Sequence, residues 1–287
     1  LIHCGKSRRH PPPKRKPMTS AIAQEKENNK KSKKTVPIVD SLATALRILD
    51  YFTLREPELS LRELSEKTGL YKSRIHRLCG TLVVLGFLTR MPSSSYRLGP
   101  KLMSLGKIYE NTNPLVTLSR SIMKQLAEVT GESVALFSLD GDTSFCLARE
   151  YGSSRLVFSI QEGDNMELHA SAAGRVLLAF GPAELCEKIL SQAELEKFTS
   201  ETITSPRRLA DELAVVKKCG YAINRGEREL EVAAFAAPLF DYNNKVEAAL
   251  AVVGPVQRFN GDNEESILKH LLQATGKISE LLGAPKR

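Results

Sequence analysis

The pattern of apolar and polar positions between residues 60 and 97 predicts a small helical motif. Ser60 and Glu63 form a capping box, in which each side chain satisfies a backbone amide at the start of a helix over residues 61–67. Gly69 follows that helix at a position suited to the left-handed conformation. The chain is therefore expected to turn sharply at Gly69 and to begin a second helix soon afterwards.

The second helix is predicted from Lys72 to Gly86 and carries one apolar stripe at 3-4-3 spacing. The stripe, which is expected to be buried, consists of Ile75, Leu78, Leu82 and Leu85. Residues 87–90 and 96–98 then read as two short strands around a polar turn. Two helices joined by a tight turn and followed by a hairpin predict a winged helix-turn-helix.

Polar and cationic side chains lie opposite the apolar stripe, where a major groove would receive them. The candidate DNA-binding residues are Lys72, Ser73, Arg74 and Arg77 on the helix, with Arg90 and Arg97 on the wing. Arginine can bind guanine through two hydrogen bonds, and Arg77 points most directly away from the stripe. Two alternatives stay open, because helix-turn-helix modules also bind only protein and an exposed arginine is often an ordinary surface charge.

A supporting helix is predicted over residues 41–54 and a further helix over residues 101–110. Their expected inward-facing residues are Leu42, Leu46, Leu49 and Phe52 in the first helix, and Leu102, Leu105 and Tyr109 in the second. The second helix is interpreted as a linker that also contacts its twin in a dimer, with a plain connector as the alternative. It is followed by a break at residues 111–114.

The remainder of the chain alternates between strand and helix patterns, which predicts an α+β domain. Strands are expected at 133–139, 143–150, 156–161, 221–224, 233–240 and 246–253, the last two joined by a hairpin through Asn243 and Asn244. Helices are expected at 115–129, 172–180, 183–190, 207–218 and 263–282. The predicted division is a disordered basic tail (1–38), the winged helix-turn-helix (39–98), a linker helix (99–111) and the α+β domain (112–287).

The net charge of +8 is distributed unevenly along the 287 residues. Residues 1–38 carry a net +9, residues 39–110 a net +4 and residues 111–287 a net −5. A basic N-terminal part and an acidic C-terminal part are typical of a nucleic-acid-binding domain joined to a separate second domain. Met18 is a candidate start for a shorter chain, since the first residue is Leu1.

Several classes of protein are disfavoured by the motifs. The five cysteines show neither a CxxC pair nor metal-ligand spacing, so reduced thiols in a cytoplasm are expected, without a metal or another cofactor. No apolar run approaches the roughly 18 residues of a membrane span, and no signal peptide is expected. An SxxK match at Ser104 stands alone, without P-loop, GxGxxG, HExxH or GxSxG motifs, so the chain is not expected to be an enzyme.

Five segments give the chain a clear resemblance to the IclR (isocitrate lyase regulator) family of bacterial transcription factors. They are LSLRELSEKTGLYKSRIHRLCGTL, YRLGPKLMSLG, LHASAAGRVLLAF, KKCGYAINRGE and AAPLFDYNNKVEAALAVVGP, and they span about residues 39–283 in order. The resemblance implies a winged helix-turn-helix followed by a GAF-like effector domain. It also implies dimers or dimers of dimers that bind double-stranded promoter DNA and respond to small metabolites, often carboxylates or aromatic compounds.

The effector-binding residues expected on this basis are His169, Ala170, Ser171, Asn224, Ala234, Ala251 and Val253. Ser171 begins a helix whose free N–H groups suit a ligand carboxylate. Asn224 can hydrogen-bond a ligand, whereas His169 has a capping or packing role as its alternative. Cys219, just before residues 221–224, is more simply explained by burial.

This chain departs from the family where the last strand often carries small hydroxyl residues and ends in Ser-Gly-Pro. Here Ala251, Val253 and the neighbouring Ala234 are apolar, which leaves few partners for a small polyoxygenated acid. The expected function is a cytoplasmic, nucleoid-associated regulator, repressor or activator, controlled by an aromatic or otherwise more apolar acid. Two alternatives are a redox-responsive regulator using Cys146 or Cys219, and a DNA-binding protein without an effector.

Overall fold

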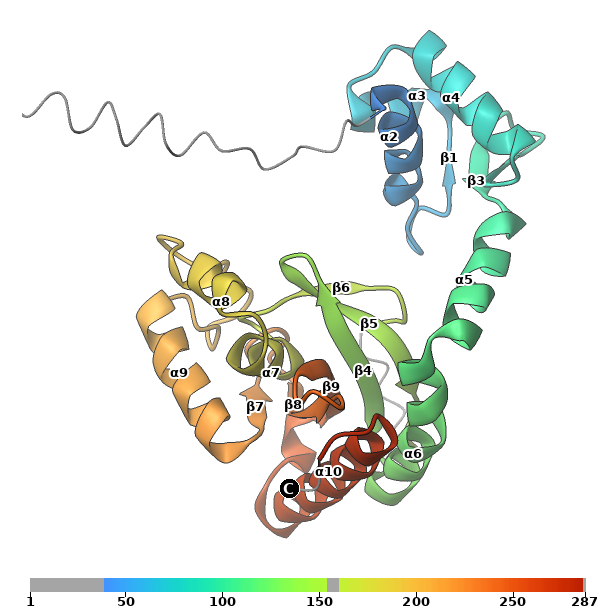
Figure 1. Cartoon of the computed structure of the whole chain (residues 1–287). Coiled ribbons are helices and arrows are strands. Elements are labelled where there is room, and N and C mark those ends of the chain that lie inside the picture. The colour runs from blue at the N-terminus through green and yellow to red at the C-terminus, as the bar shows by residue number, and fades with distance from the viewer. Residues whose placement is uncertain (1–38, 154–159, 286–287) are drawn as a thin grey trace, which may run out of the picture. The chain divides into compact units, whose positions relative to one another are not determined.

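The computed structural model describes residues 39–153 and 160–285, and these form two compact units that meet between Lys101 and Leu102. Each unit has its own sheet and its own core (Figure 1). The predicted tail of residues 1–38 and most of the strand predicted at 156–161 lie outside the described residues.

Residues 39–98 of the N-terminal unit fold into α-helices, a short 3-10 helix and a small sheet. In chain order these elements are α2 (Asp40–Arg47), the 3-10 helix η1 (Leu49–Tyr51), β1 (Glu58–Leu59), α3 (Leu61–Thr68), α4 (Lys72–Val84), β2 (Leu88–Arg90) and β3 (Tyr96–Leu98). The strands are antiparallel in the order β1-β3-β2. The predicted winged helix-turn-helix is thereby confirmed, and β1, which is too short to show a periodicity, adds a third strand to the wing.

The turn between α3 and α4 follows from local chemistry. Ser60 Oγ accepts the amide of Glu63 at 3.3 Å, and Glu63 Oε2 accepts the amide of Ser60 at 2.8 Å. Gly69 adopts a φ of 69° and donates its amide to Ser65 O, which ends α3. A side chain at Gly69 would be strained at this φ, so the glycine fixes the place where the chain reverses.

Two predicted buried stripes in this unit are confirmed in part, since Phe52, Ile75 and Leu82 are buried and Leu49 and Leu78 pack against the core. Leu42 and Leu46 are 58% and 44% exposed, and α2 instead turns Ala45 and, just beyond its end, Ile48 toward the core. In α4 the buried positions are Ile75, Cys79 and Leu82, whereas Leu78 is half-buried and Leu85 is 57% exposed. Leucine spacing alone did not give the correct phase, because a helix of two or three turns can bury either of two adjacent faces.

The C-terminal unit contains a six-stranded antiparallel sheet covered by helices on both faces (Figure 1). The strands are β4 (Ser133–Asp140), β5 (Thr143–Glu150), β6 (Asn165–Glu167), β7 (Ala222–Arg225), β8 (Val232–Phe240) and β9 (Val246–Pro255). Their order across the sheet is β6-β5-β4-β9-β8-β7. The predicted α+β class is confirmed, and β6 forms in a segment that was expected to be a loop.

The helices of this unit are α5 (Pro100–Thr112), which begins at the junction of the units, α6 (Pro114–Thr130), α7 (Ala172–Phe180), α8 (Ala183–Leu190), α9 (Pro206–Cys219) and α10 (Gly261–Leu281). Helices α7, α8 and α9 cover one face of the sheet and helices α6 and α10 cover the other. Alternate residues of the strands point to opposite faces. Ala249 and Ala251 therefore face α7 and α9, while Leu250 and Val252 face α6 and α10.

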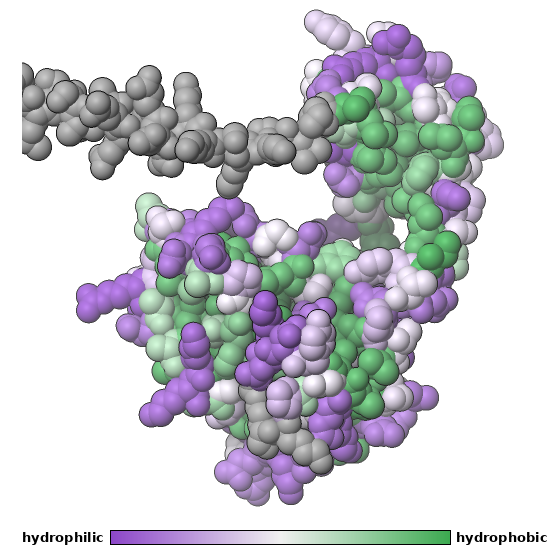
Figure 2. All heavy atoms as spheres, in the orientation of Figure 1, coloured by the Kyte–Doolittle hydropathy of each residue, from purple (hydrophilic) through white to green (hydrophobic). Residues whose placement is uncertain are grey.

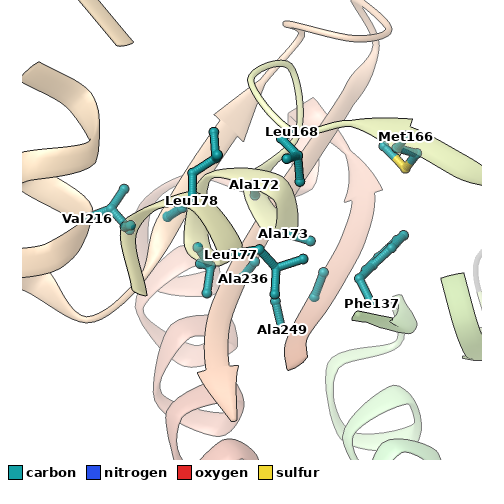
Figure 3. Packing of buried hydrophobic residues seen from close by; sticks show 14 of the residues in the cluster. Phe137, Met166, Leu168, Ala172, Ala173, Leu177, Leu178, Val216, Ala236 and Ala249 are labelled. Carbon is teal, nitrogen blue, oxygen red and sulfur yellow. The ribbon is translucent and has the colours of Figure 1, made fainter. Parts of the chain in front are cut away.

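Helix α7 is the most deeply placed element of the unit, since all but the last of its nine residues are buried. Figure 3 shows its turns between the sheet, which presents Ala236 and Ala249, and the helix that carries Val216. Small side chains at these sheet positions allow the helix to pack closely against the strands. The N-terminal end of α7, at Ala172 and Ala173, consequently lies against the sheet on the side where Phe137 is found.

Candidate nucleic-acid interface and effector cavity

The exposed face of α4 has the composition that a DNA groove requires. Lys72, Ser73, His76 and Arg77 are exposed, and Arg74 is half-buried. No side chain caps the start of the helix, so amides of its first turn can donate hydrogen bonds to a phosphate oxygen. Tyr71 at that start is 86% exposed, which is unusual for an aromatic side chain without a binding partner.

Two of the six predicted DNA-binding residues are already held by carboxylates. Arg74 Nη2 lies 3.0 Å from Asp40 Oδ2, which links α4 to α2. Arg97 Nε donates to Glu58 Oε2 at 2.8 Å across the β1–β3 pair. These contacts compete with a phosphate for both guanidinium groups, whereas Arg77 and Arg90 have no ion pair among the described residues.

Glu58 is the wing residue that the sequence reasoning missed. Its carboxylate accepts hydrogen bonds from Ser95, Ser93 and Arg97, and the hydrogen bond from Ser95 contributes most to lowering its pKa below 4.5. Glu58 therefore stays ionised and orders the tip of the wing. The role of Glu58 could not be read from the sequence, because Glu58 lies more than 30 residues before Ser93, Ser95 and Arg97.

Most of the predicted effector residues meet in one cavity at the N-terminal end of α7. Asn224, Ala234 and Val253 are joined in register across β7, β8 and β9, and Ala251 lies two residues before Val253 on β9. The cavity wall combines these four with Ala170 and Ser171 and with Phe137, Ile160, Met166, Ala172, Ala173, Arg228, Glu229 and Val232. Six of the seven residues expected from sequence thus line one space, in which apolar atoms dominate.

The polar residues of the wall are engaged with one another. Asn224 Nδ2 donates to Ala170 O at 2.7 Å, and Ser171 Oγ accepts the amide of Gly174 at 3.0 Å as the cap of α7. These bonds fix the loop before α7 against β7. Ala172 and Ala173, in the first turn of the helix, line the cavity, so a carboxylate entering it would lie near a helix N-terminus.

His169 is placed beside this cavity rather than in its wall. Its Nε2 lies 2.8 Å from Glu196 O, and its ring is 5.9 Å from the ring of Phe198. The imidazole is buried by these contacts. Among the described residues, the geometry of His169 is that of a packing residue behind the loop, which was its alternative interpretation.

The cavity is nearly closed in this structure. Its volume is about 40 Å³, whereas a single water molecule needs about 10–15 Å³ on this measure. Ligand sites for small molecules commonly have volumes of about 300–1,000 Å³. A small-molecule ligand can therefore enter only if part of the wall moves.

A buried ion pair anchors one side of that wall. Arg175 of α7 is fully buried, and its Nη1 lies 2.7 Å from Glu227 Oε2 in the β7–β8 loop. Arg175 also donates to Ile223 O. Burial raises the pKa of Glu227 above 4.5 even though the neighbouring Arg175 favours the ionised form. The sequence reasoning did not single out either residue, since an arginine inside an apolar helix reads as surface unless its partner is known.

Gly174 is required by the close approach of the chain before α7. A Cβ at this position would lie 2.3 Å from Leu168 O, so the backbone must shift to admit it. We expect Gly174→Ala to lower the free energy of unfolding by about 1–3 kcal/mol through overpacking. Denaturant titration measures the effect, and Gly276→Ala in α10 is the matched control, because its Cβ would meet no atom within 4 Å and alanine favours a helix. Equal stability of the two variants would contradict the close-packing argument.

The four described cysteines differ in their capacity for redox chemistry. Burial raises the pKa of Cys79 to about 11 and that of Cys146 to about 12, so both are thiols rather than reactive thiolates at neutral pH. Cys219 is exposed and lies with Lys217 and Lys218 in the wall of a separate cleft of about 460 Å³. Cys146 is therefore unsuited to the alternative of a redox-responsive regulator, which would have to use Cys219 instead.

Two further observations concern the described residues as a whole. No three His, Cys, Asp or Glu side chains within 39–153 and 160–285 gather in a way that could hold a metal ion. Among the helices of the same ranges, none is both long enough and apolar enough to cross a membrane.

Comparisons with known proteins identify both units. Residues 41–92 match the IclR helix-turn-helix domain, and residues 109–280 match the C-terminal domain of bacterial IclR transcriptional regulators. The chain is 30% identical to the HTH-type transcriptional regulator KipR of Bacillus subtilis (strain 168) over 243 residues, which cover 85% of this chain and 97% of KipR. It is 31% identical to the HTH-type transcriptional regulator XynR of Escherichia coli (strain K12) over 252 residues, which cover 87% of this chain and all of XynR.

Solved structures show the same fold. An IclR transcriptional regulator from Alicyclobacillus acidocaldarius has a TM-score of 0.78 at 26% identity, over 86% of this chain and 100% of that one. An IclR homologue from Microbacterium hydrocarbonoxydans, complexed with 4-hydroxybenzoate, has a TM-score of 0.74 at 26% identity, over 84% and 98% of the two chains. These relatives are transcriptional regulators and not enzymes, as expected for this chain. The chain belongs to the IclR family of bacterial transcriptional regulators, with a DNA-binding helix-turn-helix domain followed by an effector-binding domain.

Proposed function

We propose that this regulator represses transcription by binding promoter DNA through α4 and the wing, and that an aromatic or otherwise apolar carboxylic acid in the α7 cavity controls its affinity for the operator. The observation that carries the proposal is the cavity itself, whose apolar wall meets a helix N-terminus. Repression is supported by relatives described as repressors, including the transcriptional repressor IclR of Escherichia coli (strain K12), 27% identical over 248 residues.

The chemistry of the wall supports an effector more apolar than a short keto acid. Ala234, Ala251 and Val253 offer no hydroxyl group to the cavity, and Phe137 and Met166 add apolar surface. A small acid rich in oxygen would leave polar atoms unsatisfied there, which is costly. The 4-hydroxybenzoate bound to the Microbacterium homologue has the combination that this wall suits, namely an apolar ring and a carboxylate.

For the DNA contacts, we propose that Arg77 reads a base edge, while Lys72, Ser73 and Arg90 bind phosphate or sugar. Arg74 and Arg97 join the interface by exchanging Asp40 and Glu58 for phosphate oxygens. The proposed division of the chain is the DNA-binding domain over 39–98, the linker helix over 99–111 and the effector domain over 112–287. A promoter-binding role places the protein in the bacterial cytoplasm, in association with the nucleoid.

Communication between the cavity and the linker helix is proposed to pass through Arg120 of α6. Arg120 Nη2 lies 2.6 Å from Glu110 of α5, and its Nη1 lies 3.1 Å from both Glu150 of β5 and Glu162. Glu162 is two residues from Ile160, which lines the cavity. A movement of this wall therefore reaches the end of α5 through one guanidinium group, which gives the effector a physical route to the linker.

Self-association through α5 is also proposed. This helix buries none of its residues, although Met103, Leu105, Ile108 and Tyr109 are apolar and 41–73% exposed. Figure 2 shows apolar side chains along this segment. An apolar helix surface of this kind is stabilised when a second copy covers it. A dimer or a dimer of dimers would present two copies of α4 to the two half-sites of an operator.

The experiment that tests the proposed function combines operator selection with ligand titration. The full chain selects fragments of its own genomic DNA, and affinity for the selected fragment is compared with random DNA at several salt concentrations. We expect a preference of about 10³-fold or more with a steep salt dependence. Addition of 4-hydroxybenzoate should weaken operator binding, whereas pyruvate should not.

Each outcome of this experiment bears on a separate part of the proposal. Equal affinity for selected and random DNA would contradict operator recognition. Tighter control by pyruvate than by 4-hydroxybenzoate would contradict the apolar effector class. An unchanged operator affinity with both acids at millimolar concentration would contradict control by either class.

A further inference from the structure

Arg228 occupies a singular position in the wall of the effector cavity. It is the basic side chain among the described lining residues, and it lies in the β7–β8 loop directly after the buried Glu227. The opposite part of the wall is the N-terminus of α7 at Ala172 and Ala173. A guanidinium group and a helix N-terminus both favour a negative charge, and here they border the same small space.

The guanidinium of Arg228 stacks on the ring of Phe198. It lies 4.0 Å above the centre of the Phe198 ring. Thr202 Oγ1 accepts the amide of Phe198 at 3.0 Å and donates to Glu227 O at 2.6 Å. Thr202 therefore links the segment that carries Phe198 to the β7–β8 loop. Stacking uses the face of a guanidinium and leaves its N–H edge for a carboxylate.

In this structure the N–H edge of Arg228 pairs with Glu167, and the contact between the two side chains is poorly aligned. Arg228 Nη1 lies 2.9 Å from Glu167 Oε2. This oxygen is shielded from solvent, yet among the described residues no hydrogen bond reaches it. The pair is therefore close in distance without the alignment that makes an arginine–carboxylate contact strong.

We propose that Arg228 selects effectors that carry a carboxylate, and that its pairing with Glu167 is the latch that keeps the empty cavity closed. An incoming carboxylate replaces Glu167, takes the aligned N–H edge of Arg228 and frees the β7–β8 loop to move away from β6, while the Arg175–Glu227 pair keeps the start of the loop on α7. Glu229 also borders the cavity, so the ligand meets one like charge, which the guanidinium and the amides of α7 offset. This inference rests on the proposed function, since it concerns the same cavity.

The test compares two probes of equal shape, 4-hydroxybenzoate and its uncharged amide 4-hydroxybenzamide, by calorimetric titration of the full chain. Charge-assisted hydrogen bonds predict that the wild-type protein binds the acid about 10- to 100-fold more tightly than the amide. Arg228→Gln should lower this preference about 10-fold, leaving only the contribution of the α7 N-terminus, with the affinity for the amide nearly unchanged. Glu167→Gln should tighten binding of the acid several-fold, because no competing carboxylate has to leave.

Matched controls remove the same charges at exposed sites of the same unit. Arg208→Gln removes a cation from α9, and Glu231→Gln removes an anion from the β7–β8 loop, and neither residue has an ion pair among the described residues. Both should bind the two probes as the wild type does. An undiminished acid preference in Arg228→Gln would overturn the assignment of Arg228 and leave the proposed cavity standing.

A ligand-free measurement separates failure of the latch from failure of the proposed function. Hydrogen exchange of the amides at residues 226–231 should quicken in Glu167→Gln and stay unchanged in Glu231→Gln. If neither probe binds the wild-type protein, the aromatic effector class is contradicted, and exchange alone decides the latch. Unchanged hydrogen exchange in Glu167→Gln would overturn the proposed Arg228–Glu167 latch.

Discussion

Replacement of Arg175 by alanine is expected to lower the free energy of unfolding of the C-terminal unit by about 3–5 kcal/mol, because it leaves a buried carboxylate without its partner. Arg175 is the largest fully buried side chain among the described residues, and Glu227 faces it at 2.7 Å. Denaturant titration, with fluorescence or circular dichroism assigned to this unit, measures the loss. The double variant Arg175→Met with Glu227→Leu should recover much of it, since an apolar pair of similar volume fills the space without a buried charge.

The loss should depend on pH with a definite sign. Burial raises the folded-state pKa of Glu227 above its ordinary 4.5, and removal of Arg175 takes away the interaction that opposes this rise. The folded variant then binds a proton more tightly than the unfolded chain does. Stability is therefore greatest below pH 4.5 for this group and is lost as pH rises through the raised pKa. A penalty for Arg175→Ala that grows as pH falls would contradict the assignment.

Replacement of Arg77 by alanine is expected to weaken operator binding by about 1–3 kcal/mol and to relax sequence preference at one base pair. Arg77 is exposed on the outer face of α4, and no carboxylate pairs with it among the described residues. Its guanidinium is thus available to a base edge without first breaking an ion pair. Fluorescence anisotropy with the selected operator, and with operators altered at single positions, measures both effects.

Arg55→Ala is the matched control, because Arg55 is an exposed cation of the same unit outside α4 and the wing. It should change affinity little and uniformly across operators. A uniform loss for Arg77→Ala, equal on operator and random DNA, would assign Arg77 to phosphate rather than to a base. Unchanged operator affinity would remove it from the interface.

Features fixed by neighbouring residues were predictable from the sequence. The capping box at Ser60 and Glu63, the left-handed Gly69 and the bounds of α7 and α8 all agree with the structure, since each depends on chemistry within one helical turn. The wing hairpin and the β8–β9 hairpin were predicted for the same reason. Their turns contain residues suited to positive φ, such as Asn244 at 60°.

Features that depend on contacts between distant segments were predicted poorly. The core-facing residues of α2 were wrong by one face, and the very short strands β1 and β6 did not show an alternating pattern. Pairing with β3 and with β5 makes them strands. For such short elements tertiary packing outweighs local propensity.

Some residues of the candidate effector site were predicted from the sequence, and others were found only in the structure. The family pattern identified Ala170, Ser171, Asn224, Ala234, Ala251 and Val253, and the sheet register places these residues around one cavity. The pattern gave no sign of Arg228, Glu167 or the Arg175–Glu227 pair. A charged residue in a sequence looks the same whether it is solvated or stacked on an aromatic ring 30 residues away.

The amino-acid pattern was sufficient to identify the family, the α+β class, most of the helices and strands, and the helix that carries the candidate DNA contacts. Those properties rest on short-range capping, turn chemistry and periodicity, which neighbouring residues encode. The folded structure was needed to show which of the described arginines form ion pairs and that the candidate effector cavity is small. Charge pairing and cavity volume arise from segments that are distant in the chain and meet only after folding, where burial changes the energy of every charge involved.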